Sequence, residues 1–480
     1  MKGGRPLQSD PGYCRECLAK QQRIDRLEEE VLRLKAKLCR QERTAKEEPF
    51  GLSTPSAKRL IKASTPAEQR AKKGGATPGH EGHGRQGVSE AEAASLERLD
   101  APEVCPDCGT PLDFRGERDR TIIDCEPVRA VKRLVRIPAG HCSKCRRTFR
   151  PRLHGVLPRS TCSNRLLAQT ALWHYKDGLT LGHIARQFDL SKGMLIGRMH
   201  ALADLMEPAM DRLIRDWRLA PVKHADETGW RCDGRNGYTH GFFTPDISLF
   251  RCRHTRSGDV AAEVFGEVPH LGTLVVDRYA AYNRFKGLIQ YCLEHLKREI
   301  QKLTKDDPGH AECEQFESEL VPLLAEAMGL RNDPMDEAAF LVQAATIQTR
   351  IELCMAAKAR HPGIQRIQNI FRENAHRLYH WAKDRTIPAE NNLAERALRP
   401  LVIARKISFG SQSEKGLHTR EILMTLLGTL AKRTEHAVDA FVRVLDAVAE
   451  NPALDLEDFL FGPQGIAPPR APDPVAVRQA

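Results

Sequence analysis

The stretch GTLVVDRYAAYN, from Gly272 to Asn283, places a run of β-branched and apolar residues directly before a carboxylate. Such a run predicts a buried strand, and a charged side chain at its exit has to face solvent, a partner or a cation. Three earlier segments, VKHADETGWR, GYTHGFFTP and ISLFRCRH, have the same strand-like composition and are joined by short turns. A helix is expected over SGDVAAEVFGEV, between the third strand and the fourth.

The order of three strands, a helix and a strand indicates the start of a ribonuclease H-like fold, a mixed sheet with helices. The first and fourth strands of that fold lie side by side, so Asp226 and Asp277 would converge although 51 positions separate them. Two such carboxylates raise each other's pKa unless a divalent cation neutralises them. Oxygen ligands with vacant positions suit magnesium, and two such ions can activate a water or a 3'-hydroxyl for displacement at phosphorus.

A third carboxylate is expected on a helix that begins near Asn391, in the segment IPAENNLAERALRP. Glu395 is the first candidate, and Glu390 is a rival five positions earlier. Each carboxylate also has a purely structural interpretation. Asp226 or Asp277 could cap a following helix, and Glu395 stands three positions after Asn392, which is capping-box spacing. Spacing alone leaves the choice open.

Two CxxC pairs flank a strand-rich interval, and two such knuckles bring four thiolates into the tetrahedron that zinc prefers. The four predicted ligands are Cys105, Cys108, Cys142 and Cys145. Because no ligand position stays open, we expect one structural zinc ion that folds a zinc ribbon. A lone CxxC at Cys14 and Cys17 has no second pair nearby.

The N-terminal part shows two further patterns. Apolar residues from Ile24 to Leu38 recur in alternating steps of three and four, which predicts a coiled coil or an ordinary amphipathic helix. Residues 41–100 lack a sustained apolar period and have the composition of a flexible linker. No run of about 18 apolar residues is present, so we expect a cytoplasmic, nucleoid-associated protein.

The chain is basic, with a formal net charge of +11, and Val128–Thr161 contains ten Lys or Arg residues and no acidic residue. This suits a polyanionic partner such as DNA, although a solvated basic face gives the same pattern. The following segment predicts a helix-turn-helix with its turn at Asp189–Ser191, whose second helix would enter the major groove. A helical hairpin without DNA contact remains the alternative. The predicted DNA contacts in this unit are Ser191, Lys192 and Arg198.

Several of these segments together resemble the transposases of the IS66 insertion-sequence family. The motifs HADETGW, VVDRYAAYN, CLEHLKR, AENNLAERALRP and ARKISFGSQSEKG stand in the family's order, and GATPGHEGHGR matches its glycine-histidine stretch. The resemblance covers about Gly74 to Lys432. It implies that Asp226, Asp277 and Glu395 form an acidic catalytic triad that binds two Mg²⁺ or Mn²⁺ ions.

The resemblance also implies roles for residues after the triad glutamate. Arg396 and Arg399 would hold a phosphate, and Lys406 and Ser411 would lie behind them on the DNA-facing side. Glu395 follows Asp277 by 118 positions, and the charged, helical pattern between them resembles the all-helical insertion of some transposases. This insertion begins with Cys292 and His295, a CxxH pair. We interpret these two residues as making packing contacts or a local hydrogen bond, in preference to a metal site.

The sequence departs from the family pattern at two positions: Glu390 stands where the family has Asp, and Leu293 where it has an aromatic residue. We therefore expect a DDE-type transposase that binds double-stranded DNA at its element's ends, cleaves it and transfers strands. It would act as a homodimer or higher oligomer, with small accessory proteins and no membrane partner. A catalytically inactive or domesticated DNA-binding protein and a nuclease of the same fold are the alternatives.

The predicted architecture is a multidomain α+β chain. Its parts are a helical or coiled-coil segment (1–45), a basic linker (46–100), a zinc ribbon (101–155), a helix-turn-helix region (160–215), a first part of the ribonuclease H-like core (221–285), a helical insertion (286–385), a second part of the core (386–432), and a C-terminal helix and tail (433–480).

Overall fold

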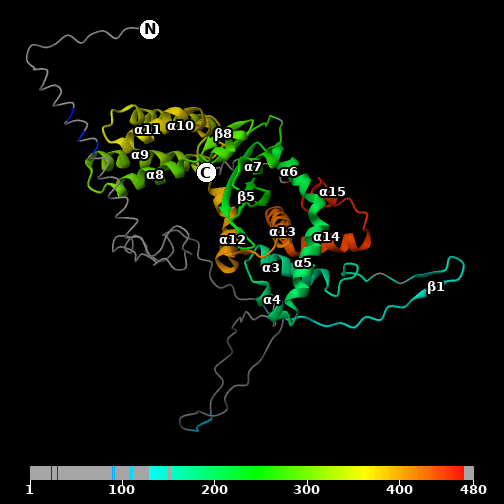
Figure 1. The fold of residues 1–480 in the computed structure, drawn as a ribbon. Coiled ribbons are helices and arrows are strands. Elements are labelled where there is room, and N and C mark those ends of the chain that lie inside the picture. The colour runs from blue at the N-terminus through cyan, green and yellow to red at the C-terminus, as the bar shows by residue number, and fades with distance from the viewer. Residues whose placement is uncertain are drawn as a thin grey trace, which may run out of the picture. The chain divides into compact units, whose positions relative to one another are not determined.

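The computed structural model describes residues 129–149, 151, 153–267 and 269–469, with isolated positions at 23, 27, 30, 89, 91 and 109–111. The predicted linker and the first CxxC pair, Cys105 and Cys108, lie outside the described residues. So does the heptad segment, except Leu27 and Glu30, which are helical. Residues 133–469 belong to one compact unit, and the following description concerns this unit (Figure 1).

A mixed five-stranded sheet lies at the centre of the unit, in the order β6-β5-β3-β7-β8. The predicted adjacency of the first and fourth strands is confirmed, because β3 pairs with β7 in parallel. Helix α7 (Gly258–Phe265) makes the crossover. The strands are β3 (Val222–Gly229), β5 (Tyr238–Phe243), β6 (Ser248–Arg253), β7 (Thr273–Val276) and β8 (Leu288–Tyr291).

Strand β8 extends the sheet beyond the sequence expectation. It pairs in parallel with β7, yet it lies within residues 286–385, which the sequence assigns to the helical insertion. Its four residues, LIQY, form too short an apolar run to stand out beside a charged, helix-forming segment. The helices of the insertion therefore begin at Leu293.

The two faces of the sheet pack against largely different helices, and α6 (Met210–Leu219) contributes residues to both cores. Neighbouring residues of β5 show the division: Phe242 packs in one core and Phe243 in the other, because successive strand side chains point to opposite faces. The Phe243 core contains α3 (Asn164–Tyr175), α5 (Lys192–Met206), α12 (Asn392–Ser408), α13 (Glu414–Arg433), α14 (Ala437–Glu450) and α15 (Leu456–Phe461). The Phe242 core contains α6 (Met210–Leu219), α7, α8 (Leu293–Asp306), α9 (Ala311–Gly329), α10 (Glu337–Ala356) and α11 (Pro362–Glu373).

Helix α13 covers the outer edge of the sheet, where β6 would otherwise leave its backbone unpaired. Three of its side chains accept hydrogen bonds from alternate amides of β6, namely Ser248 to Thr429 (3.1 Å), Phe250 to Thr425 (3.0 Å) and Cys252 to Glu421 (2.7 Å). The acceptors on α13 are four residues apart, which is about 6.0 Å along a helix, and the amides on β6 are two residues apart, which is about 6.7 Å along a strand. The two spacings therefore match. Figure 1 shows α13 beside the sheet. The helix takes the place of a sixth strand and removes an exposed edge.

Helix α4 (Leu181–Phe188) and α5 follow one another through a short turn. Asp189 ends α4 in a left-handed conformation, and the Ser191 side chain accepts a hydrogen bond from the Met194 amide at the start of α5. The expected turn at Asp189–Ser191 is therefore present. Across the described residues, no helix has the length and apolar character that crossing a bilayer requires.

We predict that Thr425→Val destabilises the protein by about 1–3 kcal/mol, because the buried Phe250 amide loses its acceptor while the side-chain volume is kept. The free energy of unfolding would be measured by urea denaturation. Thr349→Val, on the exposed face of α10, is the matched control and is expected to change stability by less than about 0.5 kcal/mol. Equal effects of the two substitutions would contradict the role of α13 as an edge cover.

Candidate active site

Asp226 and Asp277 are held level with one another by the pairing of their strands. The parallel ladder joins Val222 to Thr273 and His224 to Val275, an offset of 51 positions. The same offset separates Asp226 from Asp277 (277 − 226 = 51). The ladder itself ends two residues before the aspartates, and the charge of Asp277 contributes to the raised pKa of Asp226, so the two carboxylates lie close together at this end of the sheet.

The surroundings of Asp226 disfavour its negative charge. Burial, the largest cause, and the charges of Glu227, Asp277 and Glu395 together raise its pKa from 3.8 to about 7, against a hydrogen bond from the Glu227 amide. Burial also raises the pKa of Asp277, whose Oδ1 accepts a hydrogen bond from the Tyr279 amide at 2.9 Å. The arrangement concentrates negative charge at a half-buried sheet end, where a bound cation would relieve the repulsion.

Glu395 approaches this sheet end from the first turn of α12. Its carboxylate lies 3.4 Å from the guanidinium of Arg298 on α8, which also contacts Glu294 at 3.2 Å. The charge of Glu395 contributes to the raised pKa of Asp226, which places the three carboxylates around one site. In this structure Arg298 supplies the positive charge that faces Glu395.

Asn391 fixes the start of α12 against the sheet. It is 1% exposed, and its side chain accepts a hydrogen bond from His224 Nδ1 at 2.9 Å and donates one to the Ala225 carbonyl at 2.9 Å. Its backbone amide donates to the sulfur of Cys292, at 3.2 Å. Burial lowers the pKa of His224 to about 4, so this histidine is neutral and its Nδ1 carries the proton. Asn391 thus ties Glu395 to the residues directly before Asp226.

The structural alternatives for the carboxylates can now be compared with the geometry. Asp226 lies inside β3 and caps no helix, while Asp277 accepts a hydrogen bond within the turn before the short helix Ala280–Arg284. The capping-box interpretation of Glu395 is wrong, because the N-cap of α12 is Asn391 rather than Asn392. Burial raises the pKa of Glu390, opposed by the nearby charge of Arg331 and a hydrogen bond from Asn392.

Sequence reasoning overlooked Glu227 and Arg298. Glu227 has a side chain that is 4% exposed, and it accepts hydrogen bonds from Arg256 and from the Tyr282 hydroxyl beside the aspartates. Its only signal was its place after Asp226 in the HADETGW motif. Arg298 gave no signal, because an arginine in a charged helix usually faces solvent.

The predicted DNA contacts lie on two helices. Arg396, Arg399 and Lys406 are exposed on α12, with a spacing that places them on one face of the helix. On α5, Lys192 is exposed, Arg198 is half-buried and Ser191 caps the helix. The expectation that Ser411 lies on the DNA-facing side is wrong: it is 9% exposed and accepts a hydrogen bond from Trp230 Nε1 at 3.0 Å.

The second CxxC pair forms a hairpin knuckle. Cys142 ends β1 (Gly140–Cys142), Cys145 lies in the turn, and β2 (Arg147–Phe149) returns antiparallel. Hydrogen bonds from the backbone and thiol of Cys145 lower the pKa of Cys142. The other two predicted ligands lie outside the described residues, so the zinc ribbon stays a prediction.

Among the described residues, the CxxH pair at the start of α8 belongs to no group of three ligand atoms within 4.8 Å of one another. Cys292 precedes α8 and accepts the hydrogen bond from Asn391, while the buried Nδ1 of His295 has no hydrogen-bond partner among the described residues. This arrangement agrees with the interpretation of Cys292 as a local hydrogen-bonding residue.

Comparison with known proteins gives two findings. Residues 159–419 match the family model described as "Transposase IS66 family", and this segment contains all three carboxylates. A relative in Sinorhizobium fredii, the uncharacterised protein y4qI, is 24% identical over 417 residues, which cover 77% of this chain and 76% of the relative.

We predict that Asp226→Asn stabilises the metal-free protein at pH 8. A raised pKa means that the stability contributed by protonated Asp226 is complete below about pH 4 and is lost as the pH rises through about 7. The free energy of unfolding of the Asn variant, relative to that of the wild type, should therefore increase between pH 4 and 7 and stay constant above pH 7. Urea denaturation in the presence of a chelator would measure it, with Asp211→Asn, an exposed carboxylate on α6, as the control. A stability difference that does not change with pH would contradict the raised pKa.

Proposed function

The chain belongs to the IS66 transposase family, and from this premise we propose that it is an active DDE-type transposase. It would bind the ends of its element, cleave DNA there and transfer the strands to target DNA. The observation that carries the proposal is the common offset of 51 positions, which sets Asp226 level with Asp277 beside Glu395. The five-stranded mixed sheet supports a ribonuclease H-like core.

The chemistry of the three carboxylates fits divalent metal ions. They are hard oxygen ligands, and the raised pKa values of both aspartates reflect burial first and nearby negative charge second, which bound Mg²⁺ or Mn²⁺ would offset. Two ions bound there would supply activation of a water or 3'-hydroxyl and stabilisation of the leaving oxygen. The residues that would hold them are Asp226, Asp277 and Glu395, and Arg298 would release Glu395 for this role.

Other residues of the chain would position the reacting groups. Asn391 would fix the direction from which Glu395 enters the site, through its contacts with His224 and Ala225. Glu227 would stay with Arg256 and Tyr282, so that it supports the loop that carries Asp277 rather than binding metal.

DNA would be bound through the exposed basic face of α12 and through the α4–α5 unit. Arg396, Arg399 and Lys406 directly follow Glu395 on its helix, where they would contact backbone phosphates near the reacting bond. The second helix of the α4–α5 pair would approach the major groove with Lys192 and Arg198. A zinc ribbon would add a basic module, and joining two DNA ends would require at least two copies of the chain.

A nuclease of the same fold is the second candidate. The same metal-binding carboxylates serve hydrolysis and strand transfer, which differ in whether water or a 3'-hydroxyl attacks the phosphorus. A relic that binds DNA without chemistry is disfavoured, because all three carboxylates are present and lie near one another.

We predict that Asp277→Asn and Glu395→Gln each lower Mg²⁺-dependent cleavage and joining of element-end DNA by more than about a hundredfold, since even outer-shell partners of metal sites account for 10- to 100-fold. Products would be resolved on denaturing gels. Glu390→Gln, five positions before Glu395, is the matched control and should retain activity.

The outcomes of that assay separate the candidate functions. Cleavage without joining by the wild type would favour the nuclease. Specific binding with no cleavage, even with the neighbouring accessory proteins added, would leave the DNA-binding relic. Loss of activity in Glu390→Gln with retention in Glu395→Gln would exchange the roles of the two glutamates.

We predict that Arg399→Ala and Lys406→Ala weaken DNA binding to a similar degree for all sequences. Each removes one phosphate contact, so the slope of log K against log salt should become shallower by about 0.9. Binding would be measured by fluorescence anisotropy at several salt concentrations. Arg443→Ala, an exposed arginine on α14, should leave the slope unchanged. An unchanged slope for both α12 variants would exclude this face from the DNA-binding surface.

A further inference from the structure

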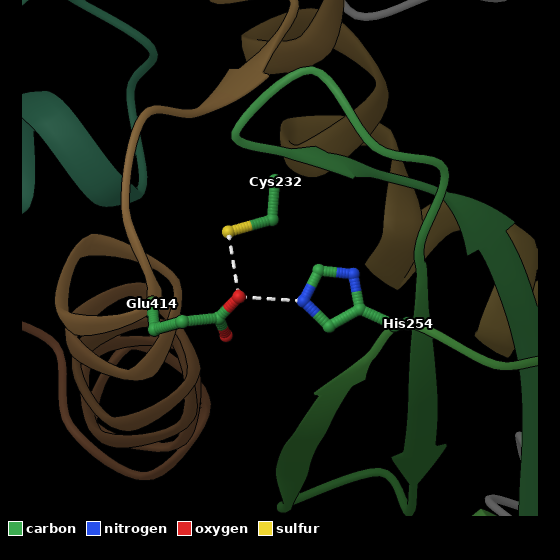
Figure 2. Close-up of side chains that lie close together, drawn as sticks. All are labelled: Cys232, His254 and Glu414. Atoms are coloured by element: carbon green, nitrogen blue, oxygen red, sulfur yellow. Dashed lines mark hydrogen bonds and ion pairs between the residues drawn. The ribbon is translucent and has the colours of Figure 1, made fainter.

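Cys232, His254 and Glu414 bring three different ligand atoms together away from the catalytic carboxylates. Cys232 ends the short strand β4 (Arg231–Cys232), His254 directly follows β6, and Glu414 is the first residue of α13. Figure 2 shows the three side chains pointing toward one another from these separate elements. Their ligand atoms all lie within 4.8 Å of one another.

The shared centre of the cluster is one oxygen of Glu414. This oxygen lies 2.6 Å from His254 Nε2 and 3.6 Å from the sulfur of Cys232. Cys232 is 1% exposed, whereas the side chains of His254 and Glu414 are 39% and 69% exposed. The protein therefore encloses the sulfur side of the cluster and leaves the other side open to water.

We propose that Cys232, His254 and Glu414 bind a zinc ion, with water as the fourth ligand. Thiolate sulfur, imidazole nitrogen and carboxylate oxygen are the three donor types that zinc accepts, and a mixed set of this kind does not suit magnesium or calcium. The site would be separate from the catalytic metals and from the predicted zinc ribbon. It does not depend on the proposed function.

The distances need only a small adjustment for zinc. Tetrahedral bonds of about 2.3 Å to sulfur and 2.0–2.2 Å to nitrogen and oxygen separate sulfur from oxygen by roughly 3.6 Å and nitrogen from oxygen by roughly 3.3 Å. The sulfur–oxygen separation already has this value. The nitrogen and oxygen atoms would part by under about 1 Å, which the exposed side chains of His254 and Glu414 can accommodate.

The position of Cys232 is fixed by its backbone. Strand β4 pairs in parallel with β9 (Gly410–Ser411), which joins Cys232 to Ser411 in the register. A side chain at Gly410 would collide with the Arg231 carbonyl, because an ideal Cβ there would lie 2.2 Å from that oxygen. The thiol is thus presented by a close backbone contact that glycine permits.

A second cluster, formed by Asp307, His310 and His361, fits a metal less well. His361 Nδ1 accepts a hydrogen bond from the Gly363 amide at 3.1 Å, so in the neutral ring the proton lies on Nε2. That Nε2 faces Asp307 at 3.3 Å and has no lone pair for a metal. Within the described residues, no such donor fixes the tautomer of His254, whose Nε2 can bind an ion.

Zinc at this site would join the start of α13 to β4 and β6. Only β9 and its flanking residues separate this point from the end of α12, the helix that carries Glu395, Arg399 and Lys406. We therefore expect the ion to stabilise the connection between α12 and α13 rather than to take part in phosphoryl transfer.

The test is the zinc content of the full-length protein, measured by elemental analysis after purification without chelators. We expect His254→Gln and Glu414→Gln each to lower the content by about one zinc per chain relative to the wild type. Any zinc held by Cys142 and Cys145 is present in the wild type and the variants alike, so it does not affect this difference in zinc content. His418→Gln is the matched control, since His418 is also 39% exposed and faces a glutamate, Glu207, at 3.4 Å.

Cobalt provides a second readout that reports the thiolate. The wild type reconstituted with Co²⁺ should show stronger sulfur-to-cobalt charge-transfer absorption than His254→Gln, while His418→Gln should match the wild type. Unchanged zinc content and unchanged cobalt spectra in both site variants would overturn the proposal and leave a hydrogen-bonded cluster. A loss of the same size in His418→Gln would also overturn it, because the effect would then not be specific to this site.

Discussion

The parallel pairing of β3 with β7 is the constraint on which the rest of the site depends. It brings Asp226 and Asp277 to the same end of the sheet, two residues beyond the paired His224 and Val275. A parallel pair requires a crossover, and α7 makes it while burying Val264 and Phe265 against the same core as Trp217. The third carboxylate, Glu395, follows a long helical insertion in the sequence. Its position therefore has to be set by tertiary contacts, because no short connection links it to β7. Asn391 provides those contacts, because its side chain bonds to the residues that directly precede Asp226.

This geometry places like charges in a half-buried position, which opposes folding in the absence of a cation. The structure shows two local compensations. The carboxyl group of Asp226 is held with a pKa near neutrality, and Arg298 faces Glu395 from α8. Metal binding would then be linked to proton release from Asp226 and to displacement of Arg298, since ligands must be deprotonated to bind. Arg298 is part of the insertion, which gives these helices a direct contact with a candidate catalytic residue.

The sequence allowed prediction of the strand order, the crossover and the start of α12, because β-branched runs and turn residues are local signals. It also indicated the adjacency of Asp226 and Asp277, since strand order determines which strand ends meet. The contacts that position Glu395 could not be predicted from local sequence patterns, because they join residues that are far apart in the chain. The capping-box interpretation failed because the Asn391 side chain is engaged by His224 and Ala225, so the helix begins one residue earlier than the motif suggests. Cys232 and Glu414 are remote in sequence, and they meet through the pairing of two-residue strands and the packing of α13 along β6.

Helix α13 shows why polarity alone is a poor guide to burial in this chain. Its buried residues include Arg420, Glu421, Thr425 and Thr429, a pattern that in an isolated sequence would indicate a solvated face. Glu421 and the two threonines instead replace the acceptors of a missing strand. Arg420 stacks over the rings of Tyr175 and Trp230, at 5.1 and 4.6 Å. Buried polar groups are stable when each has a partner of matching geometry, and here the partners are the edge amides of β6 and two aromatic faces. The helix that closes the sheet edge therefore also joins the α3–α5 region to the five-stranded sheet. The orientation of the proposed DNA-binding helices thus depends on the same contacts that complete the core.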